Sequence, residues 1–265
     1  AGAIQLAMDM VAKRVLGELP IPSDSDEDFE RVAAECLKKG KGRPNVAAAI
    51  EAVRSTRSLG IGEGLRRERA AFQTFRVGPD ARALRHLFFA ERQAAKLPEL
   101  DHVEANAVQT IAVIGAGTMG SGIAIAALDA AFNVILVDQQ DEVLMRGVDR
   151  VKDHYAKRVQ SGKDGEFSAN AKVDRLISTN DWTRLADADF VIEAIFENLD
   201  AKRAVFSSLA QVVRPGVVLA SNTSYLDLDV IAAVTHRDQD VVGLHFFSPA
   251  QVMKLVEVVQ ASASS

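Results

Sequence analysis

Two parts of the chain differ in how their apolar positions are spaced. Residues 1–107 place apolar side chains mostly at helical spacing, three or four positions apart. Residues 108–265 contain short unbroken apolar runs, separated by longer segments with a helical period. An unbroken run is typical of a strand that is buried on both faces of a parallel sheet. The pattern therefore predicts a helical region followed by an α/β domain with a doubly wound, mostly parallel sheet.

Within the helical region, the positions of Pro, Gly and acidic residues indicate where the helices begin and end. The segment Pro20–Asp28 is rich in Pro, Ser and Asp, which oppose helix interiors, and we expect a loop there. A helix is predicted over Phe29–Lys39, ending at Gly40. Two further helices follow, and a fourth begins near Pro79, a residue favoured in a first turn. Its apolar stripe is predicted to be a packing face, and it comprises Leu84, Leu87 and Phe88.

A polar linker over 97–108 separates this region from the α/β domain. The predicted strands are Ile111–Ile114, Phe132–Val137, Phe190–Ile192, Val217–Leu219 and Val241–Leu244, and Asp141–Gln160 is predicted to be a long amphipathic helix. We place the two domains at residues 1–107 and 108–265.

A glycine-rich motif follows the first predicted strand. The sequence Gly115-Ala116-Gly117-Thr118-Met119-Gly120 has the form G-x-G-x-x-G, precedes an apolar helix, and is followed by a strand that ends in Asp138. That context is the one a dinucleotide-binding βαβ unit requires. Gly115 would allow the tight turn, Gly117 would let a pyrophosphate approach the backbone, and Gly120 would let the helix pack on the sheet. Thr118 and Met119 would offer N–H groups at the helix N-terminus to that pyrophosphate.

Asp138 bears on which dinucleotide binds. Its carboxylate is placed to accept hydrogen bonds from the adenosine ribose, and it would repel a 2′-phosphate. Gln139 and Gln140 supply no compensating arginine. The sequence therefore predicts NAD rather than NADP. A glycine-rich turn without a ligand and an FAD site are the alternatives on the motif alone.

One of the five histidines stands at a position suited to chemistry. His245 lies at the carboxyl end of a predicted strand, where ligands bind in open α/β sheets. Glu257 lies in the apolar run Leu255–Val259, where a carboxylate is costly unless it is paired. A His–Glu pair would suit oxidation of a secondary alcohol, because the histidine can take the hydroxyl proton. The alternative is a histidine bonded to backbone and an edge-strand glutamate that faces water.

Other polar residues follow strand ends. The cluster Ser221–Ser224 has hydroxyl and amide groups that would bond a substrate oxygen or a nicotinamide, unless it is an ordinary capped turn. Glu193 and Glu197 straddle the end of another strand, with Lys202 one turn into the following helix. Either acid would contact the cofactor or cap that helix.

The composition of the chain limits which binding partners and which cellular compartment we expect for the protein. The chain has 265 residues and a formal net charge of −5, which predicts no general attraction to nucleic acid. No run reaches the ~18 apolar residues of a membrane span. Cys36 is the single cysteine, which fits a reducing compartment, and its helical context predicts a buried small hydrophobe. We predict no metal site.

Taken together, the motifs resemble the 3-hydroxyacyl-CoA dehydrogenase family over about residues 108–260. Four stretches carry the resemblance in register, and they are VIGAGTMGSGIA, FVIEAIFENLDAK, LASNTSYLDLD and GLHFFSPAQVMKLVEVV. The resemblance implies a Rossmann-like fold and oxidation of (S)-3-hydroxyacyl-CoA by NAD. It also implies site roles, with His245 as base, Glu257 as its partner, Ser224 on the substrate hydroxyl and Asn222 at the nicotinamide side. Glu197 and Lys202 would contact the cofactor beside the glycines and Asp138.

The helical region also resembles a known arrangement. EGLRRERAAFQTF and ARALRHLFFAERQAAK are similar to the linker of multifunctional β-oxidation enzymes of the peroxisomal bifunctional type, which join a crotonase-like enoyl-CoA hydratase to the dehydrogenase. The resemblance implies a fragment, with a hydratase core and a helical C-terminal dehydrogenase domain expected in a longer parent, and poor turnover by the isolated chain. Such a parent would act in the bacterial cytoplasm or in a peroxisome. A 3-hydroxybutyryl-CoA dehydrogenase and a non-catalytic nucleotide-binding module are the alternatives. Many members have Asn where Ser248 stands, so no contact is assigned there.

Overall fold

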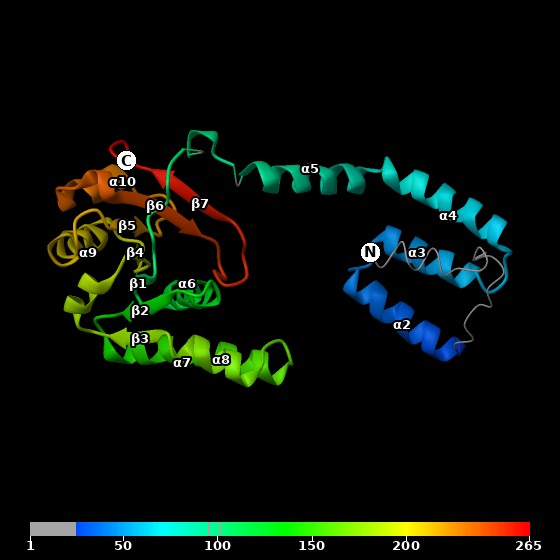
Figure 1. Ribbon diagram of the computed structural model, residues 1–265, viewed down its shortest axis with the longest axis horizontal. Helices are drawn as coiled ribbons and strands as arrows, with labels where there is room; N and C mark the ends of the chain where they lie inside the picture. The colour runs from blue at the N-terminus through cyan, green and yellow to red at the C-terminus, as the bar shows by residue number, and fades with distance from the viewer. Residues whose placement is uncertain (1–24, 95, 101) are drawn as a thin grey trace, which may run out of the picture. The chain divides into compact units, whose positions relative to one another are not determined.

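A computed structural model describes residues 25–94, 96–100 and 102–265 (Figure 1). The chain divides between Val103 and Glu104 into two compact units. Part of the predicted Pro20–Asp28 loop, with everything before it, lies outside the described residues. In the described part, no helix has the length and apolar character that crossing a membrane requires.

The first unit is helical, as its spacing predicts. Its described elements are α2 (Asp26–Lys39), α3 (Pro44–Ser55), α4 (Ile61–Arg76), α5 (Pro79–Ala94) and the short 3-10 helix η2 (Pro98–Leu100). Helix α2 starts earlier than predicted, because the hydroxyl of Ser25 accepts a hydrogen bond from the Asp28 N–H and caps the helix. The acidic residues assigned to a loop form its first turn, where negative charge is favourable.

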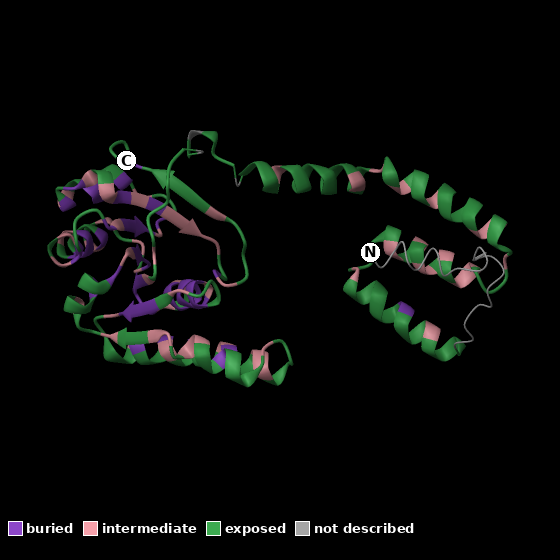
Figure 2. Cartoon of the chain, in the orientation of Figure 1, coloured by how far each residue is buried: buried purple, intermediate pink, exposed green. Residues whose placement is uncertain are grey.

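Little of this unit is buried, and two predictions made for it are wrong. Figure 2 shows the helices of the first unit mostly in green, for exposed residues. Cys36 is exposed rather than buried, since the contact of α2 with α3 buries only Ala33 on that helix. The stripe Leu84, Leu87 and Phe88 on α5 is about half exposed, at 50%, 54% and 48%. No described helix of this unit lies along α5 to cover it (Figure 1).

The second unit is built on one sheet. Its strands are β1 (Thr110–Ile114), β2 (Asn133–Val137), β3 (Leu176–Thr179), β4 (Phe190–Glu193), β5 (Val218–Ser221), β6 (Val241–Phe246) and β7 (Val256–Gln260). They lie in the order β3-β2-β1-β4-β5-β6-β7, with β1 to β6 parallel and β7 antiparallel at the edge. This order confirms the predicted doubly wound, mostly parallel sheet.

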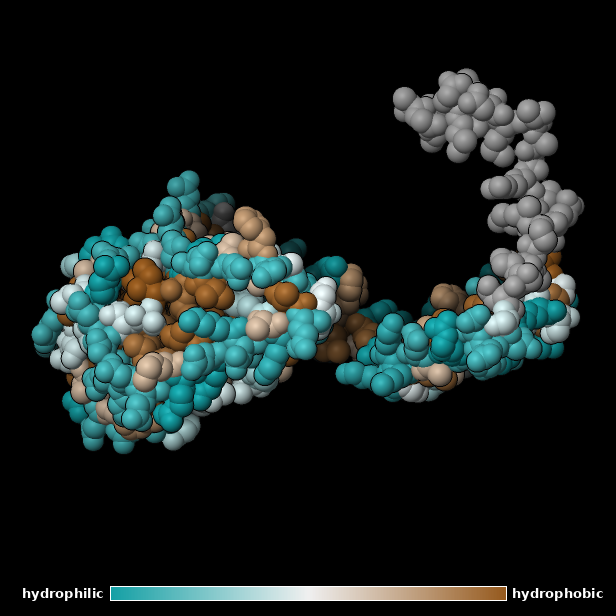
Figure 3. Space-filling view, turned by 90° about the horizontal axis from the view of Figure 1, so that it is seen from below, coloured by the Kyte–Doolittle hydropathy of each residue, from teal (hydrophilic) through white to brown (hydrophobic). Residues whose placement is uncertain are grey.

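Helices cover both faces of the sheet. They are α6 (Thr118–Asp129), α7 (Asp141–Gln160), α8 (Glu166–Val173), α9 (Leu199–Val212) and α10 (Leu228–Ala232), with 3-10 segments η3 (Trp182–Asp187), η4 (Ala233–Thr235) and η5 (Asp238–Asp240). On β1, Ile111 and Val113 pack with residues of α6 and α7, and Ala112 and Ile114 pack with residues of α9 and α10. Successive side chains of a strand point to opposite faces, so both faces of β1 are apolar. Figure 2 shows this buried core in purple, and Figure 3 shows that apolar side chains also gather in patches on the surface of this unit.

The predicted strands are confirmed to within two residues at each boundary, and the helix over Asp141–Gln160 is confirmed as predicted. Strand β3 and helix α8 had no counterpart in the prediction. Strand β3 has four residues, of which the last two are Ser178 and Thr179. It lies at the sheet edge beside β2, so it carries no long apolar run.

An ion-pair cluster joins α6, α7 and α8. Asp164 accepts from Arg158 at 2.7 Å and from Lys172 at 3.3 Å, and Lys172 also pairs with Asp129 at 2.8 Å. The hydrogen bond from Arg158 and the charge of Lys172 lower the pKa of the Asp164 carboxyl to about 2, against a partial penalty from burial.

This cluster makes stability depend on acid pH. In the unfolded chain an Asp titrates near roughly 3.9, so the stabilisation from Asp164 is present above about pH 4 and is lost as pH falls toward 2. We expect Asp164→Asn to flatten the fall in the denaturation midpoint between pH 5 and pH 2, as measured with urea at each pH. Asp149→Asn, at an exposed position on α7, is the control and should follow the wild type. Parallel pH curves for Asp164→Asn and the wild type would contradict this account.

Candidate functional site

The glycine-rich turn between β1 and α6 has the backbone that its sequence predicts. Gly115 has a φ of +101°, and a Cβ there would lie 2.8 Å from the carbonyl oxygen of Ala194, the residue after the neighbouring strand β4. A Cβ on Gly120 would lie 1.7 Å from the carbonyl oxygen of Gly115. A Cβ on Gly117 would meet nothing within 4 Å. Gly115 and Gly120 are therefore required by the fold itself, whereas the space above Gly117 is open to a ligand.

The N-terminus of α6 is suited to bind an anion. Gly117 is its N-cap and has no side chain to cap the first N–H groups of the helix. Thr118, which is exposed, and Met119, which is half-buried, are the first helical residues. The hydroxyl of Ser121 donates back to the carbonyl of Gly117 at 2.7 Å and so holds the turn. The free N–H groups and the helix dipole together favour a phosphate at this point.

Asp138 directly follows β2 and makes hydrogen bonds to the backbone of the glycine-rich turn and of its own turn. One carboxylate oxygen accepts from the Ala116 N–H at 2.9 Å, and the other accepts from the Gln140 N–H at 3.0 Å. A carboxylate has about four lone-pair positions, so each oxygen can still accept a hydroxyl of a ligand. Asp138 therefore braces the glycine-rich turn and is available to a ribose.

A cavity of about 500 Å³ opens between these elements, and we refer to it as the cofactor cavity. Its volume is in the range of small-molecule sites, roughly 300–1,000 Å³. It is lined by Ile114, Gly115, Gly117, Asp138, Gln139, Gln140, Val143, Trp182, Ala194, Ile195, Phe196, Ala201, Ala204, Val205 and Ser208. Most of these residues are apolar, and the lining also includes the Asp138 carboxylate and Gly117 at the α6 N-terminus. Trp182 in this lining was not predicted, because it follows the strand that the sequence did not reveal.

His245 and Glu257 lie directly opposite each other on the antiparallel pair β6 and β7. The Nδ1 of His245 is 2.8 Å from a carboxylate oxygen of Glu257, and its Nε2 is 3.2 Å from the hydroxyl of Ser224. The imidazole is 22% exposed and Glu257 is 53% exposed. The structure thus brings the three predicted residues together at the carboxyl end of the sheet. The reason given for pairing Glu257 was wrong, since the carboxylate is not buried in an apolar run.

Asn222 belongs to the turn after β5, but its side chain is held by the neighbouring strand. Its side-chain Oδ1 accepts from the Phe246 N–H at 2.9 Å, and its backbone N–H donates to the Glu193 carbonyl at 2.8 Å. Ser248 is exposed beyond the end of β6. Asn222 therefore fixes the ends of β4, β5 and β6 relative to one another.

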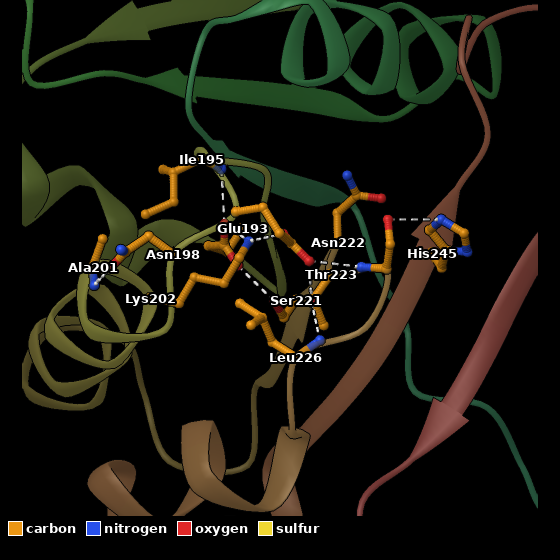
Figure 4. Close-up of polar contacts among 12 residues, drawn as sticks. Glu193, Ile195, Asn198, Ala201, Lys202, Ser221, Asn222, Thr223, Leu226 and His245 are labelled. Carbon is orange, nitrogen blue, oxygen red and sulfur yellow. Dashed lines mark hydrogen bonds and ion pairs between the residues drawn. The ribbon is translucent and has the colours of Figure 1, made fainter.

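A buried group of charged and hydroxyl side chains lies next to the turn that follows β5, residues 222–226 (Figure 4). Glu193 and Lys202 are both 0% exposed, and the Lys202 Nζ lies 2.6 Å and 2.8 Å from the two Glu193 oxygens. The second Glu193 oxygen accepts from the hydroxyl of Ser221 at 2.6 Å. Lys202 also lies 3.4 Å from Glu197. The sequence analysis considered a cofactor contact or a helix cap for Glu193. The structure shows neither, because the carboxylate is buried and pairs with Lys202 and Ser221.

Glu197 joins this buried group to the turn. One of its oxygens accepts from the Thr223 hydroxyl and, at 2.9 Å, from the Ser224 N–H. Burial raises the pKa of the Glu197 carboxyl, but these hydrogen bonds and the nearby Lys202 charge outweigh it and hold the pKa below its usual range. Glu197 is therefore an anion that anchors the turn. In the described residues, Lys202 contacts the two glutamates, and it does not line the cofactor cavity.

Two comparisons address the family. Residues 110–265 match the family model described as 3-hydroxyacyl-CoA dehydrogenase, NAD binding domain. The peroxisomal bifunctional enzyme of Danio rerio is 37% identical over 99% of this chain, which spans 37% of that protein. A probable 3-hydroxybutyryl-CoA dehydrogenase of Bacillus subtilis is 43% identical over 60% of this chain and 55% of its own length.

Solved structures show the same likeness. The crystal structure of 3-hydroxybutyryl-CoA dehydrogenase from Escherichia coli K12 matches with a TM-score of 0.59 and 44% identity, covering 60% of this chain and 34% of that chain. The glycine turn, the open space at Gly117 and the cofactor cavity fit the NAD that such a domain binds. The chain belongs to the 3-hydroxyacyl-CoA dehydrogenase family and contains its NAD-binding domain.

Proposed function

We propose that this chain provides the cofactor site and the proton-transfer residues for NAD-dependent oxidation of (S)-3-hydroxyacyl-CoA to 3-ketoacyl-CoA. The contact of His245 with both Glu257 and Ser224, at the same sheet edge as the cofactor cavity, is the observation that carries the proposal. A module that only binds nucleotide has no use for such a group. NAD, when bound, supplies the acceptor for the hydride that leaves C3 of the substrate.

The protein's own residues handle the proton. With Nδ1–H donated to Glu257, the Nε2 of His245 has a lone pair, which the Ser224 hydroxyl engages in the described structure. A substrate hydroxyl would donate to that lone pair and accept from Ser224. The proton then passes to Nε2 as the C3–O bond becomes a carbonyl, and the Glu257 carboxylate stabilises the imidazolium. Asn222, fixed to β6, would support the nicotinamide side.

The cofactor contacts follow from the cavity. The pyrophosphate would lie at the α6 N-terminus over Gly117, with Gly115, Thr118, Met119 and Gly120 forming the turn around it. The adenosine ribose would bond Asp138, and the adenine would face the apolar lining residues, which include Trp182. Glu197 would complete the site on the nicotinamide side.

For the whole protein we propose a multifunctional β-oxidation enzyme that also has an enoyl-CoA hydratase activity. The match to a bifunctional enzyme extends over 99% of this chain, whereas the two 3-hydroxybutyryl-CoA dehydrogenases match 60% of it. The helical residues before the α/β unit are therefore shared with the bifunctional relatives. An acyl-CoA thioester is the proposed substrate, and a bacterial cytoplasm or a peroxisome is the proposed location.

Nucleotide titration tests the cofactor part of this proposal. We expect the chain to bind NADH, and to bind NADPH at least ~10-fold more weakly, because the Asp138 carboxylate repels a 2′-phosphate. Calorimetry gives both affinities. Trp182, the single tryptophan of the chain, should change its fluorescence in the same titration because it lines the cofactor cavity. Equal affinity for the two nucleotides, or no binding by a folded chain, would contradict the proposal.

Asp138→Asn separates the two roles of this carboxylate. Loss of a hydrogen bond to the turn should weaken both nucleotides alike, whereas loss of the charge should favour NADPH alone. We therefore expect the ratio of NADH affinity to NADPH affinity to fall about 10-fold, which corresponds to roughly 1.4 kcal/mol. The ratio is the measurement, and an unchanged ratio would assign Asp138 to the turn only.

A further inference from the structure

Two hydrogen bonds and one ring contact surround the imidazole of His245. Its Nδ1 is 2.8 Å from Glu257, and its Nε2 is 3.2 Å from the Ser224 hydroxyl. Figure 4 shows this imidazole on β6, joined by a dashed line to the neighbouring turn. The ring of Phe247 lies against the same imidazole, with 4.7 Å between the ring centroids and 50° between the ring planes. The proposed proton transfer uses both hydrogen bonds, but it does not use the ring contact.

Neither hydrogen bond holds the imidazole firmly through the proposed reaction. The bond between Nε2 and the Ser224 hydroxyl must be exchanged, because the substrate hydroxyl takes the same lone pair. The carboxylate of Glu257 is 53% exposed, so its contact with Nδ1 competes with water and is weak. The imidazole itself is 22% exposed. Its orientation during proton transfer therefore depends on a further contact.

The ring of Phe247 provides such a contact. Aromatic rings attract each other when their centroids are roughly 4.5–7 Å apart, and this pair lies at the close end of that range. The contact uses no proton and no lone pair of the imidazole. It therefore persists while Nε2 exchanges the Ser224 hydroxyl for that of the substrate.

The chain on both sides of Phe247 is fixed to other elements. Before it, the N–H of Phe246 donates to the side chain of Asn222 at 2.9 Å, in the turn after β5. After it, Ala250 is 5% exposed, and a Cβ on Gly122 of α6 would lie 3.2 Å from the Ala250 Cβ. A ring carried by a segment that is anchored at both ends can restrict the motion of the imidazole beside it.

We propose that Phe247 is a positioning residue, which holds the His245 imidazole so that Nε2 points at the substrate hydroxyl when the substrate replaces Ser224 there. The proposal rests on the proposed function, because this orientation affects the rate only if His245 transfers the proton. Geometry at such a residue matters, since a displacement of about 1 Å can slow a reaction roughly 100-fold.

Three substitutions test the role of the ring. Phe247→Leu removes the aromatic ring and keeps an apolar side chain, whereas Phe247→Tyr keeps the ring. Phe190→Leu is the matched control, because Phe190 is also half-buried but packs against the core at the start of β4, at the opposite end of the parallel strands. Urea denaturation measures the stability of each variant.

The rate and the affinity are measured on the whole chain. We expect Phe247→Leu to slow the single-turnover oxidation of NADH by acetoacetyl-CoA about 5-fold, the effect to which the strength of an aromatic pair converts. NADH affinity should stay within ~2-fold of wild type, because Phe247 does not line the cofactor cavity. Phe247→Tyr and Phe190→Leu should both react within ~2-fold of the wild-type rate.

The same substitution in the His245→Gln chain distinguishes positioning from a general structural role. If Phe247 acts through His245, the two substitutions are coupled, and their effects on the rate do not multiply. We therefore expect Phe247→Leu to leave the residual rate of the His245→Gln chain nearly unchanged. A residue that supports the fold or the substrate would slow both chains by the same factor.

The possible outcomes separate this role from the proposed function. A wild-type rate in the folded Phe247→Leu chain, or equal slowing in both backgrounds, would overturn the positioning role. A His245→Gln chain as fast as the wild type would instead overturn the proposed proton transfer. If the wild-type chain oxidises no NADH, the catalytic function fails for this chain, and NMR relaxation of the His245 imidazole then tests positioning alone. Greater ring motion in Phe247→Leu than in the wild type and Phe247→Tyr would support it, and equal motion in all three would contradict it.

Discussion

Replacing His245 with Gln is expected to slow the single-turnover oxidation of NADH by acetoacetyl-CoA by about 10²–10⁴-fold, the usual contribution of a positioned acid or base. In this direction the histidine gives its proton to the ketone oxygen as hydride reaches C3. Gln has a similar length and can bond Glu257 and Ser224, but it has no proton of suitable acidity to give. NADH affinity should stay within about 2-fold, because His245 does not line the cofactor cavity. The rate is followed by NADH absorbance, and affinity by calorimetry.

Glu257→Gln provides the matched comparison. The amide oxygen can still accept from Nδ1 of His245, so the ring keeps its orientation, whereas the charge that favours the imidazolium is lost. We expect a smaller loss of rate than for His245→Gln, since Glu257 is 53% exposed and its charge is screened by water. An unchanged rate in the His245→Gln chain would remove that residue from the mechanism. An equal loss in both variants would show that proton transfer by His245 depends fully on the Glu257 charge, which stabilises the imidazolium.

The sequence was informative where chemistry depends on order along the chain. The glycine turn and Asp138 directly follow strands, His245 lies near the end of β6, and Glu257 lies within β7. Unbroken apolar runs predict these strands, and parallel strands bring their carboxyl ends to one edge. The doubly wound sheet is confirmed for the same reason. Identifying β6 and a following apolar run was enough to pair His245 with Glu257, although the burial argument used for Glu257 did not hold.

What escaped prediction depends on contacts between residues distant in the sequence. Glu193, Ser221 and Lys202 belong to β4, β5 and α9, and only the packing of α9 on the sheet brings them together. Their residue types suggested a helix cap or a cofactor contact, since a fully buried Lys is uncommon. The prediction that the apolar stripe on α5 is a packing face was wrong for a different reason. Helical spacing predicts an apolar face, but it does not predict whether another helix covers that face.

Gly120→Ala is expected to abolish NADH binding and to lower the free energy of unfolding by about 1–3 kcal/mol or more, the usual cost of overpacking. The added Cβ would lie 1.7 Å from the Gly115 carbonyl oxygen, so α6 would have to move away from β1. Because the N–H groups of this helix are the proposed pyrophosphate site, the same movement removes the binding geometry. Urea denaturation measures the stability, and calorimetry measures the affinity.

Gly117→Ala distinguishes an effect on NADH binding from an effect on the stability of the fold. A Cβ there meets nothing within 4 Å, and its φ of −68° suits alanine, so the cost should be that of a poorer N-cap, about 1 kcal/mol. Gly165→Ala makes the same change at the N-cap of α8, where a Cβ also meets nothing within 4 Å, and calibrates that cost. With a methyl group in the way of the pyrophosphate, Gly117→Ala should lose charge-assisted hydrogen bonds of about 1.5–3 kcal/mol, or roughly 10- to 150-fold in NADH affinity. Gly165→Ala should bind NADH as the wild type does. Equal NADH affinity in the Gly117→Ala and Gly165→Ala chains would show that the open space above Gly117 is not where the pyrophosphate lies, and the proposed cofactor position would have to be abandoned.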